Sequence, residues 1–287
     1  MSTAFADSSE NKVAAAGSQP GRLVKRHRLS TRIWHWVNVI AVFTLLGSGL
    51  TIFNAHPRLY WGSYGANYDP AWLEIEDRNG GSEGYLRIAG LEIETTGVLG
   101  VFKKDGRERT RAFPHYLTIP AEYSLAEGRR YHLVMAWIFG LGGALYAVWS
   151  LINRHAQRDL APTRRELRPS HIWADIKQHA KLRFPRGEEA LSYNILQKLS
   201  YSLVIFVILP LMVLSGLGMS PNMNTAWPWI LDLFGGRQSA RSIHFITGFL
   251  LVLFILVHLF MVLAAGPINE VRSMITGKSR IRGGDAS

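Results

Sequence analysis

Four long stretches of this chain contain no Lys, Arg, Asp or Glu, and they restrict its fold more than any other feature of the sequence. The stretches cover residues 33–53, 131–152, 199–219 and 242–265. Each is close to the roughly 20 residues that an α-helix, rising ~1.5 Å per residue, needs to cross the ~30 Å hydrocarbon core of a bilayer. The sequence therefore predicts an all-α membrane protein, built as a bundle of four transmembrane helices.

The polar remainder of the chain divides into tails and connections around these helices. The longest connection is expected to be a small extracytoplasmic insert that contains β-strands, because residues 85–96 alternate apolar and polar side chains between turn residues. We predict transmembrane helices over 30–53, 126–153, 196–219 and 239–265, with the insert over 54–125 and an outer loop over 220–238. The cytoplasmic segments are expected to be a tail over 1–29, a basic loop over 154–195 and a second tail over 266–287.

The net charge of +11 lies on one side of the predicted membrane. The segments 1–32, 153–198 and 266–287 together hold 20 Lys and Arg against 9 Asp and Glu, whereas 54–130 and 220–241 hold 12 of each. An excess of Lys and Arg in short loops marks the cytoplasmic side, so both termini are expected in the cytoplasm. This distribution argues against nucleic acid as a partner. The first 32 residues lack an apolar core and are not expected to form a cleavable secretory signal.

Four histidines lie inside or at the mouths of the apolar stretches: His35, His132, His244 and His258. An ionisable side chain in a membrane helix is costly, so such a residue suggests a function. The chain contains no cysteine, which excludes covalent c-type haem, iron–sulfur clusters and disulfide bonds within it. Histidine is then the natural strong ligand for a haem, and four of them suggest two bis-histidine haems.

The predicted topology pairs these histidines by depth. Helices two and four enter the membrane from outside, so His132 and His244 are both expected at the outer level. His35 and His258 are both expected near the cytoplasmic level. His258 follows His244 by 14 residues, which returns it to within about 40° of the same helix face, roughly 21 Å further along the axis. We therefore predict an outer haem b between His132 and His244 and an inner haem b between His35 and His258. The alternative is that these histidines only form polar hydrogen bonds between helices.

Three of the histidines follow an arginine by three residues. The arginines are Arg32, Arg129 and Arg241. A spacing of three residues places both side chains on one helix face. Each chain segment is entering the membrane at this point, so each arginine lies on the aqueous side of its histidine. Guanidinium groups suit carboxylates, and we therefore predict that these three arginines bind haem propionates.

The ligand pattern resembles that of the four-helix dihaem cytochrome b family, which includes the membrane subunits of periplasmic nickel–iron hydrogenases and formate dehydrogenases. In that family helices one and two supply one ligand each, and helix four supplies two that are 14 residues apart. The resemblance covers residues 25–53 and 126–275. It implies a location in the bacterial inner membrane, electron exchange with quinone, and a periplasmic redox protein as partner. The chain departs from the family in its large outer insert, which suggests a partner of the molybdenum oxidoreductase type.

The resemblance also points to a quinone site before helix three. An asparagine in this part of the family lies beside the quinone and the cytoplasmic haem, and here the match is Asn194, with Gln197 and Lys198 nearby. These side chains are polar donors at the cytoplasmic end of a span and could bind a quinone carbonyl. The alternative is a helix N-terminus with interfacial anchors.

The expected function is transmembrane electron transfer as the quinone-reactive subunit of an oxidoreductase complex. One alternative is a stand-alone membrane oxidase that passes electrons from a small diffusible donor, such as superoxide or ascorbate, to quinone. Another is a protein without redox function, such as an assembly scaffold or a transporter. The sequence leaves open the electron donor, the direction of flow, the quinone type and the oligomeric state, with a homo-oligomer among the options.

Overall fold

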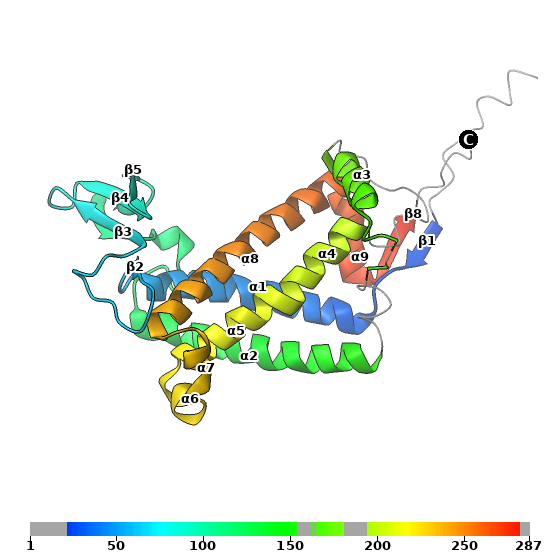
Figure 1. Cartoon of the computed structure of the whole chain (residues 1–287). Coiled ribbons are helices and arrows are strands. Elements are labelled where there is room, and N and C mark those ends of the chain that lie inside the picture. The colour runs from blue at the N-terminus through cyan, green and yellow to red at the C-terminus, as the bar shows by residue number, and fades with distance from the viewer. Residues whose placement is uncertain (1–21, 154–161, 164, 181–193, 282–287) are drawn as a thin grey trace, which may run out of the picture. The chain divides into compact units, whose positions relative to one another are not determined.

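The computed structural model describes residues 22–153, 162–163, 165–180 and 194–281 (Figure 1). Most of the tail expected over 1–29 and of the loop expected over 154–195 lies outside these residues. The chain forms two compact units that are described separately. The first draws on Met1–Ile33, Asp159–Leu199 and His258–Ser287, and the second on Trp34–Arg158 and Ser200–Val257.

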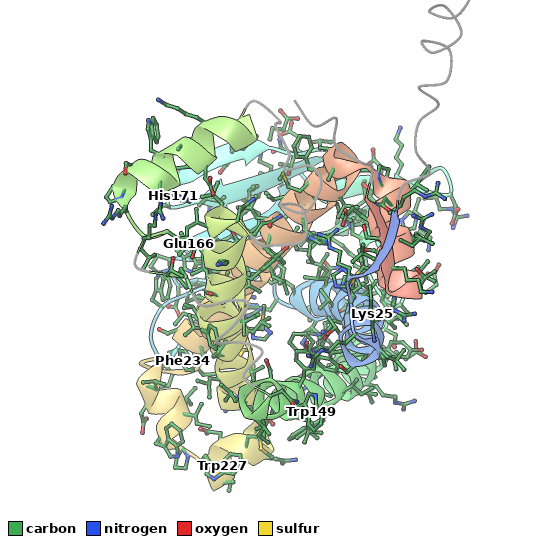
Figure 2. The ribbon with its side chains drawn as sticks, turned by 90° about the vertical axis from the view of Figure 1, so that its right-hand side faces the viewer. Lys25, Trp149, Glu166, His171, Trp227 and Phe234 are labelled. Atoms are coloured by element: carbon green, nitrogen blue, oxygen red, sulfur yellow. The ribbon has the colours of Figure 1, made fainter. Side chains whose placement is uncertain are left out.

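Four helical spans in the described residues are long and apolar enough to cross a membrane. They are α1 (Leu29–Phe53), α2 (Leu125–Ile152), the continuous run Ile195–Met219, and α8 (Arg237–Ala265). Their outer surfaces are apolar. Trp149 projects from α2 (Figure 2) and has 57% of its surface exposed, and Leu145 of the same helix is 73% exposed. Such surfaces suit lipid as the surrounding solvent. The predicted fold class, a four-helix membrane bundle with a β-containing insert between the first two helices, is confirmed.

The third span changes its helical pitch part-way along. It consists of α4 (Ile195–Leu203), the π-helical turn η5 (Val204–Ile208) and α5 (Leu209–Met219). The backbone N–H of Leu209 donates to the carbonyl oxygen of Val204, five residues earlier. Pro210, which follows, has no N–H and its ring would collide with the carbonyl four residues before it in a regular α-helix. The wider turn directly before the proline avoids this collision.

The insert between α1 and α2 forms two small antiparallel sheets. The strands are β2 (Arg58–Leu59), β3 (Leu73–Arg78), β4 (Glu83–Ile88), β5 (Leu91–Glu94), β6 (Gly100–Lys104) and β7 (Arg107–Arg111). The first sheet has the order β2-β3-β4-β5, and β6-β7 is a hairpin. One 3-10 turn, η2 (His115–Leu117), precedes α2. Ser124 caps α2 by accepting the N–H of Glu127, as the Ser-x-x-Glu pattern favours.

One face of the four-stranded sheet packs onto the bundle. Leu73 and Ile75 are buried against Phe53 at the end of α1, with Phe245 of α8 packed against the same cluster. The rings of Phe53 and Phe245 are 4.8 Å apart. Trp72, at the start of this sheet, donates its indole N–H to Ser242 of α8 at 2.9 Å. The insert is thus fixed to the end of α1, from which it emerges, and to the start of α8. We call this the insert end of the bundle.

The opposite face of the sheet carries a ladder of ion pairs. Glu74 is 94% buried because its neighbours cover it, and it accepts from Arg87 at 2.9 Å, from Arg58 at 3.1 Å and from the Tyr85 hydroxyl at 2.5 Å. Arg87 also binds Glu92 at 2.9 Å. Burial, the largest cause, and the adjacent Glu74 carboxylate raise the pKa of Tyr85 above its usual range. A fully paired buried carboxylate of this kind holds strands β2, β3 and β4 in one register.

The hairpin β6-β7 crosses the sheet at two glycines. A Cβ atom on Gly100 would lie 2.4 Å from the carbonyl oxygen of Glu76 and 2.8 Å from the Cα of Gly84. A Cβ atom on Gly84 would lie 2.2 Å from the carbonyl oxygen of Leu99. Only glycine therefore allows the two backbones to approach so closely. Gly100 also has a φ of +77°, which L-residues rarely adopt.

The remaining elements flank the spans. In the second unit α6 (Pro221–Ala226) and α7 (Trp229–Leu233) connect α5 to α8. In the first unit are α3 (Pro169–Ala180), α9 (Pro267–Thr276), and the strands β1 (Arg22–Lys25) and β8 (Lys278–Ile281). The two strands pair antiparallel, and Arg26 binds Glu270 at 2.9 Å. Both strands lie in segments that were expected to be tails. Residues 22–25 and 278–281 instead pair with each other.

Candidate functional site

The second unit brings two of the four predicted ligands close together. The imidazole rings of His132 on α2 and His244 on α8 have centroids 6.2 Å apart and planes at 63° to each other. Both side chains are partly buried, and both lie on apolar helices. Helical spacing alone places each of them about two turns inside the insert end of its span.

A backbone carbonyl fixes the protonation of each ring. His132 Nδ1 lies 3.1 Å from the carbonyl oxygen of Leu45, and His244 Nδ1 lies 3.0 Å from that of Met212. A carbonyl oxygen can only accept a hydrogen bond, so in the neutral imidazoles Nδ1 carries the proton. The Nε2 atom of each ring then keeps a free lone pair, which is the form that binds a metal.

Two opposed imidazoles with free Nε2 atoms suit a haem iron better than a metal held by side chains alone. Among the described residues, no group of three or more His, Cys, Asp or Glu side chains could hold a metal ion. A zinc site needs three or four such ligands, whereas a haem needs only axial ones. With bonds of about 2 Å and nitrogens roughly 1 Å from their ring centres, two imidazoles on one ion have centroids about 6 Å apart. The observed separation of 6.2 Å fits this arrangement.

Comparison with known proteins identifies the family. The model of the prokaryotic cytochrome b561 family matches residues 26–277. The chain belongs to this family. Membership implies that it binds haem b and is a multi-pass membrane electron-transfer protein, as the sequence analysis predicted.

One curated relative extends this comparison. A putative protein-methionine-sulfoxide reductase subunit, YedZ1, from Azospira oryzae is 25% identical over 231 residues, which is 80% of this chain and 86% of the relative. No solved structure shows a significant match.

The other two predicted ligands belong to different units. His35 lies on α1 in the second unit, and His258 lies on α8 in the first, 14 residues after His244. Each unit is described by itself, so the pairing of His35 with His258 stays a prediction from sequence.

The three predicted propionate ligands differ in their surroundings. Arg241, one turn before His244, has its guanidinium 5.7 Å from the centroid of the Phe53 ring and donates to the carbonyl oxygen of His56. Arg129 is exposed on α2. Arg32 donates to carbonyl oxygens at the end of α9, those of Met274, at 3.4 Å, and Ile275. Arg241 and Arg129 are thus at the insert end, and Arg32 also caps a helix C-terminus.

His56 is a residue at the insert end that the sequence analysis did not single out. Its Nε2 atom is buried and has no hydrogen-bond partner among the described residues. Burial, together with Arg241 and Arg58 nearby, lowers the pKa of His56. The ring is therefore neutral at ordinary pH. No pattern in the sequence signals this residue, because it is a single histidine just beyond an apolar stretch.

The three predicted quinone ligands have defined partners within the first unit. Asn194 Oδ1 accepts the backbone N–H of Gln197 at 2.9 Å, and Gln197 Oε1 accepts that of Asn194 at 3.3 Å. This reciprocal pair is a capping box at the start of α4. Lys198 Nζ lies 2.8 Å from Glu166. Hydrogen bonds, first from Lys198 and then from the Thr163 backbone, lower the pKa of Glu166 to about 2.

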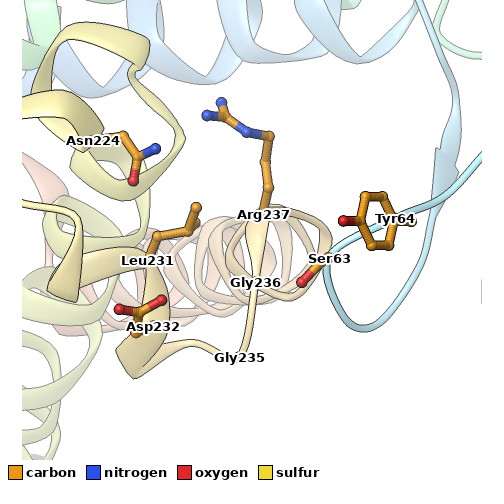
Figure 3. A pocket seen from close by; sticks show the side chains of 8 residues that line it. All are labelled: Ser63, Tyr64, Asn224, Leu231, Asp232, Gly235, Gly236 and Arg237. Atoms are coloured by element: carbon orange, nitrogen blue, oxygen red, sulfur yellow. The ribbon is translucent and has the colours of Figure 1, made fainter.

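A polar pocket of about 430 Å³ opens at the insert end of the second unit (Figure 3). Its walls come from the insert at Tyr64, from α6 at Asn224, from α7 at Asp232 and from the start of α8 at Arg237. Arg237 donates to the carbonyl oxygen of Met219 at 2.7 Å. The pocket thus carries one cation and one carboxylate.

Proposed function

We propose that this chain is a dihaem cytochrome b that carries electrons across the membrane between an extracytoplasmic oxidoreductase and the quinone pool. The observation that carries the proposal is the opposed pair His132 and His244, with Nδ1 of each ring hydrogen-bonded to a carbonyl. Family membership supports electron transfer and haem b, while the number of haems and the quinone belong to the proposal.

The four predicted haem ligands and two of the three predicted arginines have roles in this proposal. His132 and His244 would hold one haem at the insert end, and His35 and His258 would hold the second at the other end. When bound, the two haems supply reversible one-electron chemistry. Arg129 and Arg241 lie one turn on the aqueous side of their histidines, where their charges would hold propionates.

In this proposal, the orientation of the chain across the membrane follows from the distribution of charge. The basic segments mark the cytoplasmic side, so the insert lies on the opposite, extracytoplasmic side. The insert is then available to a partner protein. The related chain named as a protein-methionine-sulfoxide reductase subunit supports a reductase partner over a hydrogenase or a formate dehydrogenase. With a reductase as partner, electrons flow from quinol towards the insert end.

A small diffusible donor is the competing proposal, and the pocket does not favour it. An anion such as superoxide is attracted by an excess of positive charge around its site. The pocket balances Arg237 against Asp232, so it lacks that excess.

Proteoliposomes with quinol in the membrane and a membrane-impermeant oxidant outside test the proposal. Haem-loaded protein should show reducible b-type absorption bands and should oxidise quinol only when the insert end faces the oxidant. A chain that shows no reducible haem, or a rate that does not depend on orientation, would exclude transmembrane electron transfer.

Quinone binding is predicted at Asn194, Gln197 and Lys198. Lys198→Met removes the cation and should slow the reduction of the haems by quinol, followed by stopped flow, by roughly 5- to 150-fold, the effect of losing a contact worth about 1–3 kcal/mol. Reduction by dithionite should be unchanged because dithionite bypasses the site.

Two matched variants separate this effect from local stability. Glu166→Gln breaks the same ion pair but keeps the lysine, so quinol-driven reduction should not slow. Asn194→Ser keeps an N-cap side chain but loses the amide, so it should also slow the reaction. Equal rates for Lys198→Met and wild type would place the quinone elsewhere.

A further inference from the structure

Both opposed imidazoles contact a buried serine on a neighbouring helix. Ser48 Oγ of α1 lies 3.1 Å from His132 Nδ1, and Ser215 Oγ of α5 lies 3.1 Å from His244 Nδ1. Both serines have an exposed fraction of 0%. The third span, which supplies no predicted haem ligand, thus takes part in the site through Ser215.

Each serine hydroxyl donates its proton to a backbone carbonyl oxygen, and this defines which group donates in the contact between serine and imidazole. Ser48 Oγ donates to the carbonyl oxygen of Thr44 at 2.6 Å, and Ser215 Oγ donates to that of Leu211 at 2.6 Å. Each bond runs back four residues along the serine's own helix, a common use of a helical hydroxyl. The oxygen of each serine is therefore left to accept, and the single Nδ1–H of each ring is shared between the serine oxygen and the backbone carbonyl oxygen.

A glycine follows each serine and lies against the same ring. A Cβ atom on Gly49 would be 3.4 Å from His132 Cε1, and one on Gly216 would be 3.3 Å from His244 Cε1. A Cβ atom on Gly216 would be tight enough that the His244 ring must give by a few tenths of an ångström, whereas one on Gly49 would be in van der Waals contact with the His132 ring. The Ser-Gly dipeptide is visible in the sequence at 48–49 and 215–216, but periodicity does not show which ring each one contacts.

We infer that Ser48–Gly49 and Ser215–Gly216 are matched positioning motifs that orient His132 and His244 and lower the reduction potential of the haem they hold. This inference rests on the proposed function. An acceptor at Nδ1–H makes an imidazole a stronger donor at Nε2, and stronger donation favours the ferric state. Each ligand is therefore adjusted by a helix other than its own: α1 acts on α2, and α5 acts on α8.

Redox titration of the full-length, haem-loaded protein tests the inference. Ser48→Ala and Ser215→Ala should each raise the potential of the same one of the two haems, by up to about a tenfold change in its reduction equilibrium, which is 59 mV for one electron. The haem should stay bound because the carbonyl oxygens of Leu45 and Met212 remain as acceptors. Thr44→Val is the matched control, since the Thr44 hydroxyl donates to Ile40 of its own helix at 2.8 Å.

The outcomes separate this inference from the proposed function. His132→Ala identifies the component that the serines should shift. If that component is lost but neither serine variant moves it more than Thr44→Val does, the positioning role is wrong and the proposed function stands. If His132→Ala leaves both haems in place, the ligand assignment itself fails.

The glycines provide a second readout that needs no serine variant. Gly216→Ala should turn the His244 ring and change the g-values of one low-spin ferric signal in the electron paramagnetic resonance spectrum of isolated membranes. Gly140→Ala on α2 is the control, because a Cβ atom there meets open space. An unchanged spectrum for Gly216→Ala would overturn the inference.

Discussion

Replacement of His244 by alanine is expected to lower the haem content from two per chain to one. The same component should be lost in His132→Ala, because the two rings face each other at 6.2 Å and are predicted to share one iron. His35→Ala should remove the other component. A pyridine haemochrome assay counts the haems, and a redox titration shows which component is missing.

His171→Ala is the control for these variants, since His171 is exposed on α3 (Figure 2), a helix that is not part of any of the four spans. It should keep two haems per chain. Some loss of stability is expected in the ligand variants, because each leaves a buried partner unpaired. Loss of one and the same component in His35→Ala and His132→Ala would disprove the assignment by depth.

Gly100→Ala is expected to unfold the insert. Its Cβ would lie 2.4 Å from the carbonyl oxygen of Glu76, a backbone atom that cannot turn away. Overpacking costs about 1–3 kcal/mol and occasionally more, and a left-handed residue with a Cβ costs roughly 1–2 kcal/mol in addition. Hydrogen exchange of the full chain in detergent should show lost protection across β3, β4 and β6.

Gly106→Ala separates the cost of the steric collision from the cost of the left-handed backbone conformation. Gly106 has a φ of +74°, close to the +77° of Gly100, but a Cβ there meets nothing within 4 Å. It should cost only the backbone strain and leave the insert protected. If the two variants lose protection equally, the close crossing of β6 over the sheet is not what stabilises the insert.

The main architecture could be predicted from sequence because lipid imposes simple requirements. A span must be apolar over about 20 residues, and the four uncharged stretches meet this condition. The condition does not depend on which other helices each span contacts. The approach of His132 to His244 also follows from topology, since depth depends only on where a helix enters the membrane. Their role as ligands stays a prediction.

Other features depend on contacts that periodicity does not contain. The pairing of β1 with β8 joins segments more than 250 residues apart, and neither segment alone has a strand signal long enough to recognise. The contact of Ser215 with His244 depends on the rotation of α5 about its axis, which hydrophobic patterning leaves open. Asn194 was predicted as a quinone ligand, and its capping bond to Gln197 could equally be read from the Asn-x-x-Gln spacing.

The π-helical turn in the third span has a consequence for the comparison of related chains. A π-turn holds one residue more than the α-helical turn that would span the same height, and the helix after it continues in nearly the same direction and phase. A relative that lacks one residue between Val204 and Ile208 could therefore keep a serine at the place of Ser215. We expect such relatives to require a one-residue gap within a membrane helix, where alignments usually forbid gaps. Without that gap, every position from Leu209 to Met219 would be aligned one residue out of register with the relative.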